Sequence, residues 1–192
     1  MNKERVIEIF KQTGVLQEGH FKLSSGLHSN QYLQCAQVLQ YPVYAQELAK
    51  GLAKKFSEVD IDVVVGPAMG GVTLSYAVGL ALEKKTIFTE REAGKMVLRR
   101  GFRLNPGDKV LVIDDVLTTG KSVNEVIEVL DRTEANLAGV GVLVDRSAGQ
   151  VDFKAPIESM LQIDVKAYQP QECPMCKEEI EFNQPGSRHL NK

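Results

Sequence analysis

The sequence predicts an α/β fold, with a central, mostly parallel sheet flanked by helices, a small N-terminal flap and a C-terminal tail. Strand-like and helix-like segments alternate between residues 61 and 144, which implies parallel pairing with helices on both faces of the sheet. Residues 110–113 are apolar at every position, as expected for a strand buried on both faces near the sheet centre. The length of 192 residues, 43% of them hydrophobic, suits one well-buried domain.

The elements are expected in the following order. Val6, Ile9 and Phe10 are spaced as on one side of a helix over the first thirteen residues. Pro42 occupies a favoured helix start. The remaining expectations are extended pieces at 21–23 and 31–35, helices at 43–56, 72–82 and 123–130, strands at 61–65, 86–89, 109–113 and 137–144, and a long loop or exposed hairpin at 90–108. We divide the single domain into a flap (1–40), a core (41–168) and a polar tail (169–192).

Composition and charge exclude several function classes. The net charge of −2 and the lack of a basic run argue against a nucleic-acid partner, although a small local patch stays open. No apolar run is long enough to span a membrane, and the charged first ten residues do not resemble a signal peptide. Three cysteines, a low and odd count, fit a reducing compartment, so we expect a cytoplasmic protein.

The strongest functional signal is the segment 110–122, Val-Leu-Val-Ile-Asp-Asp-Val-Leu-Thr-Thr-Gly-Lys-Ser. A buried strand ends in Asp114 and Asp115, a short loop follows, and a helix begins. In open parallel sheets the ligand crevice lies at the carboxyl ends of the strands, and a helix start favours a phosphate group. Gly120 allows close backbone approach. The two carboxylates suit sugar hydroxyls, or a magnesium ion bound through water.

Two other interpretations of this segment explain less. The ending Gly-Lys-Ser resembles an ATP-binding P-loop, but that motif requires glycine at position 115, which is Asp. A capping role for the acids and for Thr119 leaves the paired Asp and the Thr-Thr-Gly sequence unexplained together.

The segment resembles the signature of the type I phosphoribosyltransferase family. The resemblance implies that family's fold and a loop that binds the 5-phosphate of phosphoribosyl pyrophosphate, while Asp114 and Asp115 contact the ribose 2- and 3-hydroxyls. Magnesium would be the cofactor, held mainly by substrate and water rather than by protein ligands. The implied binding residues of the loop are Asp114, Asp115, Val116, Leu117, Thr118, Thr119, Gly120, Lys121 and Ser122.

A second loop, Gly-Pro-Ala-Met-Gly-Gly at 66–71, also follows an expected strand. Free amides there would suit a second phosphate group, although a tight strand-to-helix turn explains the glycines equally simply. The loop is similar to the family's pyrophosphate loop, which would make Ala68, Met69 and Gly70 substrate contacts.

The N-terminal stretch 19–29, with Tyr32, resembles the opening segment of orotate phosphoribosyltransferases, which packs over the base site. By the same resemblance Arg146 binds the orotate carboxylate, with Thr118 as its partner. An arginine offers a planar pair of donors to a carboxylate. The alternative is a surface arginine paired with Asp145.

Residues 90–101 occupy the place of the family's mobile catalytic loop. Arg91 and Lys95 are our preferred catalytic pair, because they could neutralise departing pyrophosphate. Arg99 and Arg100 fit a solvated basic hairpin equally well. The resemblance further implies a homodimer in which this loop reaches the neighbouring subunit's site.

The resemblance as a whole implies transfer of phosphoribose from phosphoribosyl pyrophosphate to orotate. The products would be orotidine 5-phosphate and pyrophosphate, in pyrimidine nucleotide synthesis. Better-known orotate enzymes have lysines where this chain has Ser24 and Gly70, so the match is closer to a short bacterial subgroup with a tail like residues 185–188. A purine phosphoribosyltransferase, and a nucleic-acid-binding sensor of phosphoribosyl pyrophosphate, are the alternatives.

The tail contains Cys173 and Cys176 at the spacing of half a zinc site. A full site needs four ligands, and only Cys35, His20, His28 and His189 remain as sulfur or imidazole donors. One such pair is weak evidence, and a redox role is a further alternative. We therefore expect a reduced structural turn that carries little zinc.

Overall fold

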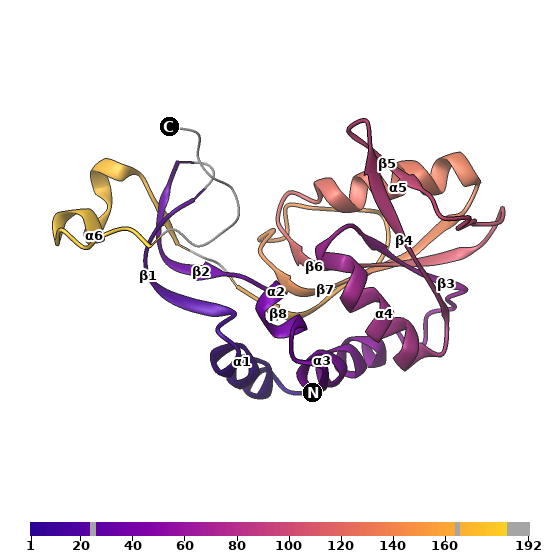
Figure 1. Cartoon of the computed structure of the whole chain (residues 1–192), viewed down its shortest axis with the longest axis horizontal. Helices are drawn as coiled ribbons and strands as arrows, with labels where there is room; N and C mark the ends of the chain where they lie inside the picture. Colours follow the sequence, from indigo (N-terminus) through magenta and orange to yellow (C-terminus); the bar gives the residue numbers. More distant parts are fainter. Residues whose placement is uncertain (24–25, 164–165, 184–192) are drawn as a thin grey trace.

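A six-stranded sheet forms the centre of the larger part of the molecule, on the right in Figure 1. The computed structural model describes residues 1–23, 26–163 and 166–183. The sheet order is β5-β4-β3-β6-β7-β8, and every neighbouring pair is parallel except β4 with β5. Its strands are β3 (Val63–Pro67), β4 (Lys85–Glu92), β5 (Lys95–Leu98), β6 (Lys109–Leu117), β7 (Asn136–Asp145) and β8 (Ile157–Gln162). Because β3, β6 and β7 are parallel neighbours, the loops that follow them meet at one edge.

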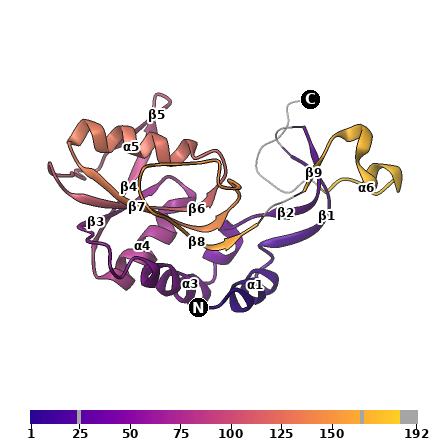
Figure 2. The ribbon, with the colours of Figure 1, turned by 180° about the vertical axis from the view of Figure 1, so that it is seen from behind.

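Helices cover both faces of this sheet (Figure 2). They are α1 (Lys3–Gln12), α2 (Ala36–Leu39), α3 (Pro42–Lys55), α4 (Gly70–Leu82) and α5 (Lys121–Thr133). Leu111 and Ile113 of β6 belong to the core under α1, α3 and α4, whereas Val110 and Val112 belong to the core under α5. This alternation confirms the prediction of a central strand buried on both faces.

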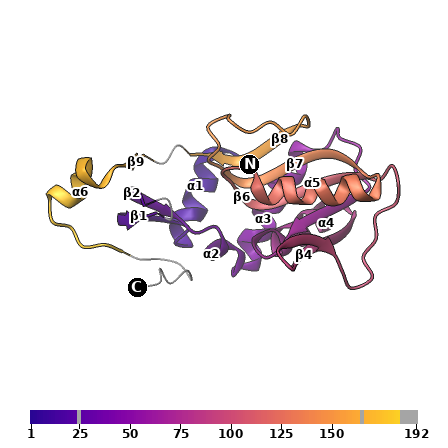
Figure 3. The ribbon, with the colours of Figure 1, turned by 90° about the horizontal axis from the view of Figure 1, so that it is seen from above.

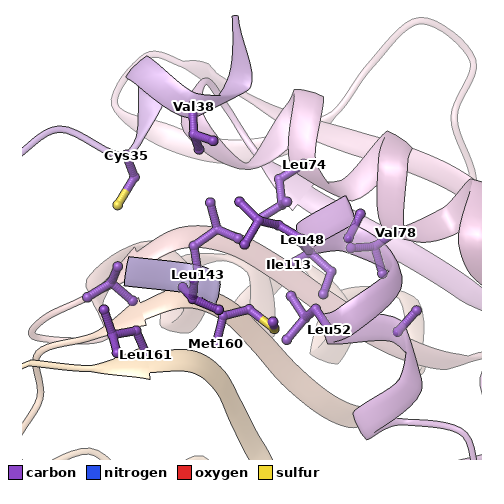
Figure 4. Packing of buried hydrophobic residues seen from close by; sticks show 14 of the residues in the cluster. Cys35, Val38, Leu48, Leu52, Leu74, Val78, Ile113, Leu143, Met160 and Leu161 are labelled. Carbon is purple, nitrogen blue, oxygen red and sulfur yellow. The ribbon is translucent and has the colours of Figure 1, made fainter. Parts of the chain in front are cut away.

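The larger core fixes the strands that carry the site. Leu48 and Leu52 of α3 and Leu74 and Val78 of α4 gather around Ile113 of β6 (Figure 4). All five side chains are fully buried, and burial of such a side chain contributes about 1.5–3 kcal/mol. The ends of β3 and β6 are therefore held by a tightly packed layer.

A second, three-stranded antiparallel sheet lies beside the main body (Figure 3). It consists of β1 (Leu16–Lys22), β2 (His28–Leu33) and β9 (Ala167–Tyr168), and is followed by a 3-10 turn, η1 (Pro170–Glu172), and by α6 (Pro174–Lys177). Pairing of β2 with β9 returns the end of the chain to the N-terminal hairpin. The hairpin of the expected flap and the expected tail therefore lie together, with a further bridge between Phe21 and Asn183, whereas α1 and α2 of the flap pack on the main core.

The predicted alternation from β3 to β7 is confirmed, with boundaries shifted by a few residues. The predicted exposed hairpin is confirmed where β4 and β5 pair. The extended pieces expected at 21–23 and 31–35 overlap the ends of the longer strands β1 and β2, and Cys35 instead is the N-cap residue of α2. Strand β8 was not predicted, because it is an edge strand in which only Met160 and Leu161 are buried.

Several predicted features lie outside the described residues, namely Ser24, the segment 185–188 and His189. Within the described ranges, the helices are all too short or too polar to cross a membrane.

Candidate active site

Three predicted segments converge at the carboxyl edge of the sheet. They are the turn at 66–71 after β3, the loop at 114–122 at the end of β6, and Arg146 after β7. The Arg146 backbone N–H donates to the Leu117 carbonyl at 2.8 Å, and this bond ties the end of β7 to the phosphate loop. The structure therefore brings together residues that are far apart in the sequence.

Asp114 and Asp115 form a crowded acidic pair at the end of β6. Asp114 is buried and accepts two hydrogen bonds, from the Asp115 N–H at 2.9 Å and from the Ser122 hydroxyl at 2.6 Å. Burial, and then the neighbouring Asp115 charge, raises the pKa of Asp114 to about 7. Burial also raises the pKa of Asp115. Crowded carboxylates of this kind favour a ligand that offers hydroxyl donors or a cation.

The phosphate loop opens directly onto the first turn of α5. Thr118, Thr119 and Lys121 are exposed, whereas the Ser122 hydroxyl is already engaged with Asp114. Gly120 precedes the helix with φ 73°, and a Cβ there would lie 2.9 Å from Phe153. Only glycine fits this position without strain. The first backbone amides of α5 lack intrahelical partners and are available to an anion.

A hollow of about 350 Å³ lies at this loop, lined by Arg91, Val116 and residues 118–122. It is large enough for a phosphate group and part of a sugar. A hollow of about 350 Å³ beside β8 is lined by Lys3, Lys55 and residues 157–162, and contains none of the predicted site residues.

The two preferred catalytic cations differ in position. Arg91, on β4, lines the phosphate hollow, and its guanidinium is bound by the Glu125 carboxylate of α5. Lys95 lies exposed at the start of β5 and is not part of that lining. Arg99 and Arg100 pair with Glu92 and Glu90 of the same hairpin. These last contacts favour the solvated-hairpin interpretation for both arginines.

The turn after β3 packs tightly against β6. A Cβ at Gly71 would lie 2.6 Å from the Ile113 carbonyl oxygen, so packing alone requires glycine there. The peptide bond between Ala68 and Met69 is cis, and the Ala68 N–H donates to the Thr89 carbonyl at 3.1 Å. The Met69 side chain is 86% exposed. The amides at the start of α4, from Gly70 onward, are thus the donors best placed for a phosphate.

Arg146 is half-buried beside the phosphate loop. In the described part of the chain it forms no ion pair, and Asp145 instead accepts the Ser147 N–H at 2.8 Å. The surface ion pair with Asp145 is therefore absent from the described residues. The guanidinium of Arg146 is therefore a candidate pair of donors for a substrate carboxylate.

Cys35 is a site neighbour that sequence reasoning did not identify. Burial raises the pKa of its thiol, and the charges of Asp115 and Arg146 act on that thiol in opposite directions. Cys35 therefore lies near these two charged residues, in the larger core. A buried free cysteine is usually a small apolar core residue, so its position alone gave no signal.

Comparisons with known proteins agree with this geometry. The family model described as "Phosphoribosyl transferase domain" matches residues 34–174. An orotate phosphoribosyltransferase from Desulforamulus reducens is 50% identical over 190 residues, covering 99% of this chain and 100% of the relative. One from Thermotoga maritima is 52% identical over 183 residues, covering 95% and 98%. The crystal structure of orotate phosphoribosyltransferase from Aeropyrum pernix, 27% identical, superposes with a TM-score of 0.70 and covers 82% of this chain and 93% of that one. The chain belongs to the orotate phosphoribosyltransferase family of type I phosphoribosyltransferases.

Proposed function

We propose that this protein transfers phosphoribose from phosphoribosyl pyrophosphate to orotate, giving orotidine 5-phosphate and pyrophosphate in pyrimidine nucleotide synthesis. One observation carries the proposal: the acidic pair at the end of β6, the Thr-Thr-Gly loop at the start of α5, and Arg146 after β7 meet at the same edge of the sheet. These groups match the hydroxyl, phosphate and carboxylate groups of the two substrates.

Phosphoribosyl pyrophosphate would lie across the carboxyl edge of the sheet. Its 5-phosphate would accept hydrogen bonds from the loop around Thr118 and Thr119 and from the first amides of α5. Asp114 and Asp115 would accept hydrogen bonds from the ribose hydroxyls, and these bonds would offset the crowding of the two carboxylates. The pyrophosphate group would lie at residues 68–70, at the start of α4.

The acidic pair also fits a magnesium ion, which prefers oxygen ligands and usually retains several waters. We propose that pyrophosphate oxygens and water hold this ion, with Asp114 and Asp115 contributing through water. When bound, magnesium would neutralise charge on the pyrophosphate leaving group.

Orotate would be oriented by Arg146 and Thr118. Arg146 offers two parallel donors to the orotate carboxylate and lies next to the loop that positions the sugar. As the bond from the sugar carbon to pyrophosphate breaks, positive charge develops on the sugar. The protein would act by holding both partners in position and by offsetting pyrophosphate charge with Arg91 and Lys95. No side-chain nucleophile is required.

We also propose that the protein is a homodimer. Large apolar side chains are exposed on α3 and α4, two helices that pack together, with Val43 75%, Tyr76 69% and Leu80 59% exposed. Tyr76 and Leu80 are four residues apart on α4 and therefore lie side by side, and an exposed apolar patch is typical of a protein interface. A neighbouring subunit packed there would bring a second β4–β5 hairpin to the molecule, which would give the exposed Lys95 a site to reach.

The direct test is an assay of purified protein with phosphoribosyl pyrophosphate, magnesium and a panel of bases. We expect orotate to be consumed, and uracil and the purines to react poorly. Turnover of adenine, guanine or hypoxanthine in preference to orotate would replace the proposal by a purine phosphoribosyltransferase. Salt-dependent binding of nucleic acid without any turnover would indicate a regulator.

A further inference from the structure

Four potential metal ligands converge in the small sheet, outside the crevice. His20 comes from β1, His28 from β2, and Cys173 and Cys176 from the tail at α6. Their ligand atoms all lie within 4.8 Å of one another. The hairpin and the tail that carry them lie side by side in Figures 1 and 2. We propose that these four residues bind one structural zinc ion.

Four of the six separations among the ligand atoms are close to those of a tetrahedral zinc site, and the other two lie within 4.8 Å. Zn–S bonds of about 2.3 Å and Zn–N bonds of about 2.0–2.1 Å imply tetrahedral edges of about 3.3 Å for N–N and about 3.6 Å for N–S. His20 Nε2 lies 3.2 Å from His28 Nδ1 and 3.5 Å from Cys173 Sγ. Cys176 Sγ lies 3.7 Å from His20 Nε2 and 3.2 Å from His28 Nδ1. These four edges differ from the expected ones by a few tenths of an ångström.

The second nitrogen of His20 supports the same assignment. His20 Nδ1 lies 2.7 Å from the Ile180 carbonyl oxygen, which can only accept a hydrogen bond. Nδ1 must therefore carry the proton, which leaves Nε2 with a free lone pair within 3.7 Å of the other three ligand atoms. A backbone carbonyl on the far nitrogen is the usual partner of a metal-ligating histidine.

The surroundings indicate a structural ion and not a catalytic one. His20, His28 and Cys173 are buried, and Phe182 packs on both imidazole rings, with centroids 4.0 Å from His20 and 4.8 Å from His28. Four protein ligands complete a tetrahedral zinc shell and leave no position for a substrate.

One end of the small sheet is anchored in the larger core, through Leu33 of β2 and Leu16 of β1. Among the described residues, the buried side chains near the proposed ion, Phe21, Cys173 and Met175, belong to neither of the two large apolar clusters. Very small units often depend on a metal in place of a core. The ion would join residues more than 140 positions apart and hold the tail against β1 and β2.

Sequence reasoning favoured a metal-free turn because one Cys-x-x-Cys pair is half a site. The missing half is supplied by two histidines on the hairpin, whose spacing of eight residues matches no common zinc pattern. The proposal is independent of the transferase activity, since none of the four ligands belongs to the crevice.

The test is metal analysis of the full-length protein, expressed without a polyhistidine tag and purified in metal-free buffer under reducing conditions. We expect about one zinc per chain. Addition of a mercurial reagent to the intact protein should release that zinc to a colorimetric chelator. Protein that carries almost no zinc, and that takes up neither zinc nor cobalt after reduction, would overturn the proposal. A disulfide between Cys173 and Cys176 in reducing buffer would also overturn it.

Two variants localise the ion. Cys176→Ser should lose most of the zinc, and Cys35→Ala, which removes a buried thiol outside the cluster, should retain it. Cobalt-substituted wild type should show the visible absorption of a tetrahedral site with two thiolate ligands, and this readout does not depend on how well a variant folds. Equal zinc content in Cys176→Ser and wild type would exclude the assigned ligands.

Discussion

The carboxylate of Asp115 lies directly against the α-carbon of Gly70. A Cβ added at Gly70 would come within 2.7 Å of Asp115 Cγ and within 2.8 Å of both carboxylate oxygens. This contact joins the turn after β3 to the acidic end of β6. In the proposed complex it fixes the spacing between the ribose hydroxyls and the pyrophosphate group. It also explains why a side chain as large as lysine does not fit at position 70 of this chain.

Gly70→Ala should therefore impair the site more than the fold. The added methyl group must displace the Asp115 carboxylate, and overpacking of this kind typically costs about 1–3 kcal/mol. We expect a loss of about tenfold or more in kcat/KM for phosphoribosyl pyrophosphate. Steady-state kinetics and thermal melting would measure the two effects. Thr73→Ala, at an exposed position of the same helix, is the control and should leave kcat/KM unchanged. Normal kinetics in Gly70→Ala would show that the Asp115 position is not critical.

Asp114 should make stability depend on pH. Burial and the neighbouring Asp115 charge raise its pKa in the folded protein to about 7, whereas the pKa of an Asp in an unfolded chain is about 4. Between these values the folded protein binds a proton that the unfolded chain has lost, so stability falls as the pH rises. Asn at position 114 does not titrate and should remove that loss.

Between pH 5 and pH 8, the free energy of unfolding of Asp114→Asn should rise by about 1–3 kcal/mol relative to that of wild type. Thermal melts of both proteins at each pH measure this difference. Comparing variant with wild type at the same pH cancels the contributions of the other titrating groups, which both proteins share. Asp115→Asn should shift in the same direction. A difference between variant and wild type that is equal at both pH values would show that Asp114 ionises normally in the folded protein.

The sequence predicted the main sheet well, because long-range order there follows from local pattern. Val110 to Ile113, for example, could only form a strand covered on both faces. The phosphate loop was equally predictable, because its acids, hydroxyls and glycine are contiguous. These features require no knowledge of which distant segments meet.

Features made by distant segments were not predictable in the same way. Three such features depend on packing: the contact of Gly70 with Asp115, the burial of Cys35 in the larger core, and the meeting of His20 with Cys173. The side chains at 17–20 of β1 are polar or absent, so its pattern resembles a loop. Strand β9 has only two residues and becomes a strand through its partner β2.

The exposed position of Lys95 predicts that it acts in the neighbouring subunit. Lys95→Ala and the double variant Asp114→Asn with Asp115→Asn should each be nearly inactive, because one lacks the cation and the other lacks the sugar contacts. When the two variants are mixed in equal amounts and exchange subunits, the mixture should regain about a quarter of wild-type activity. Half of the dimers are then mixed, and each mixed dimer has one intact site out of two. Mixing with catalytically silent bovine serum albumin is the control. No recovery, with exchange confirmed by mass spectrometry of the native dimers, would show that Lys95 acts within its own subunit or not at all.

Arg146 should determine the choice of base and not the binding of the sugar phosphate. It follows the buried strand β7, its backbone N–H donates to the Leu117 carbonyl, and its guanidinium forms no ion pair within the described residues. Arg146→Ala would remove a charge-assisted pair worth about 1.5–3 kcal/mol, or a ten- to hundredfold loss.

That loss should appear in the Michaelis constant for orotate or in turnover, with the affinity for phosphoribosyl pyrophosphate nearly unchanged. Uracil, which lacks the carboxylate, should be a poor substrate for wild type and should lose little more in the variant. Arg146→Lys keeps the charge but not the planar pair of donors, so it should recover only part of the orotate activity. Initial rates with orotate and uracil measure the effect on the base, and calorimetry measures the affinity for phosphoribosyl pyrophosphate. If Arg146→Ala weakened the binding of both substrates equally, Arg146 would act at the sugar phosphate. The preference for orotate would then have to come from the N-terminal segment around Tyr32.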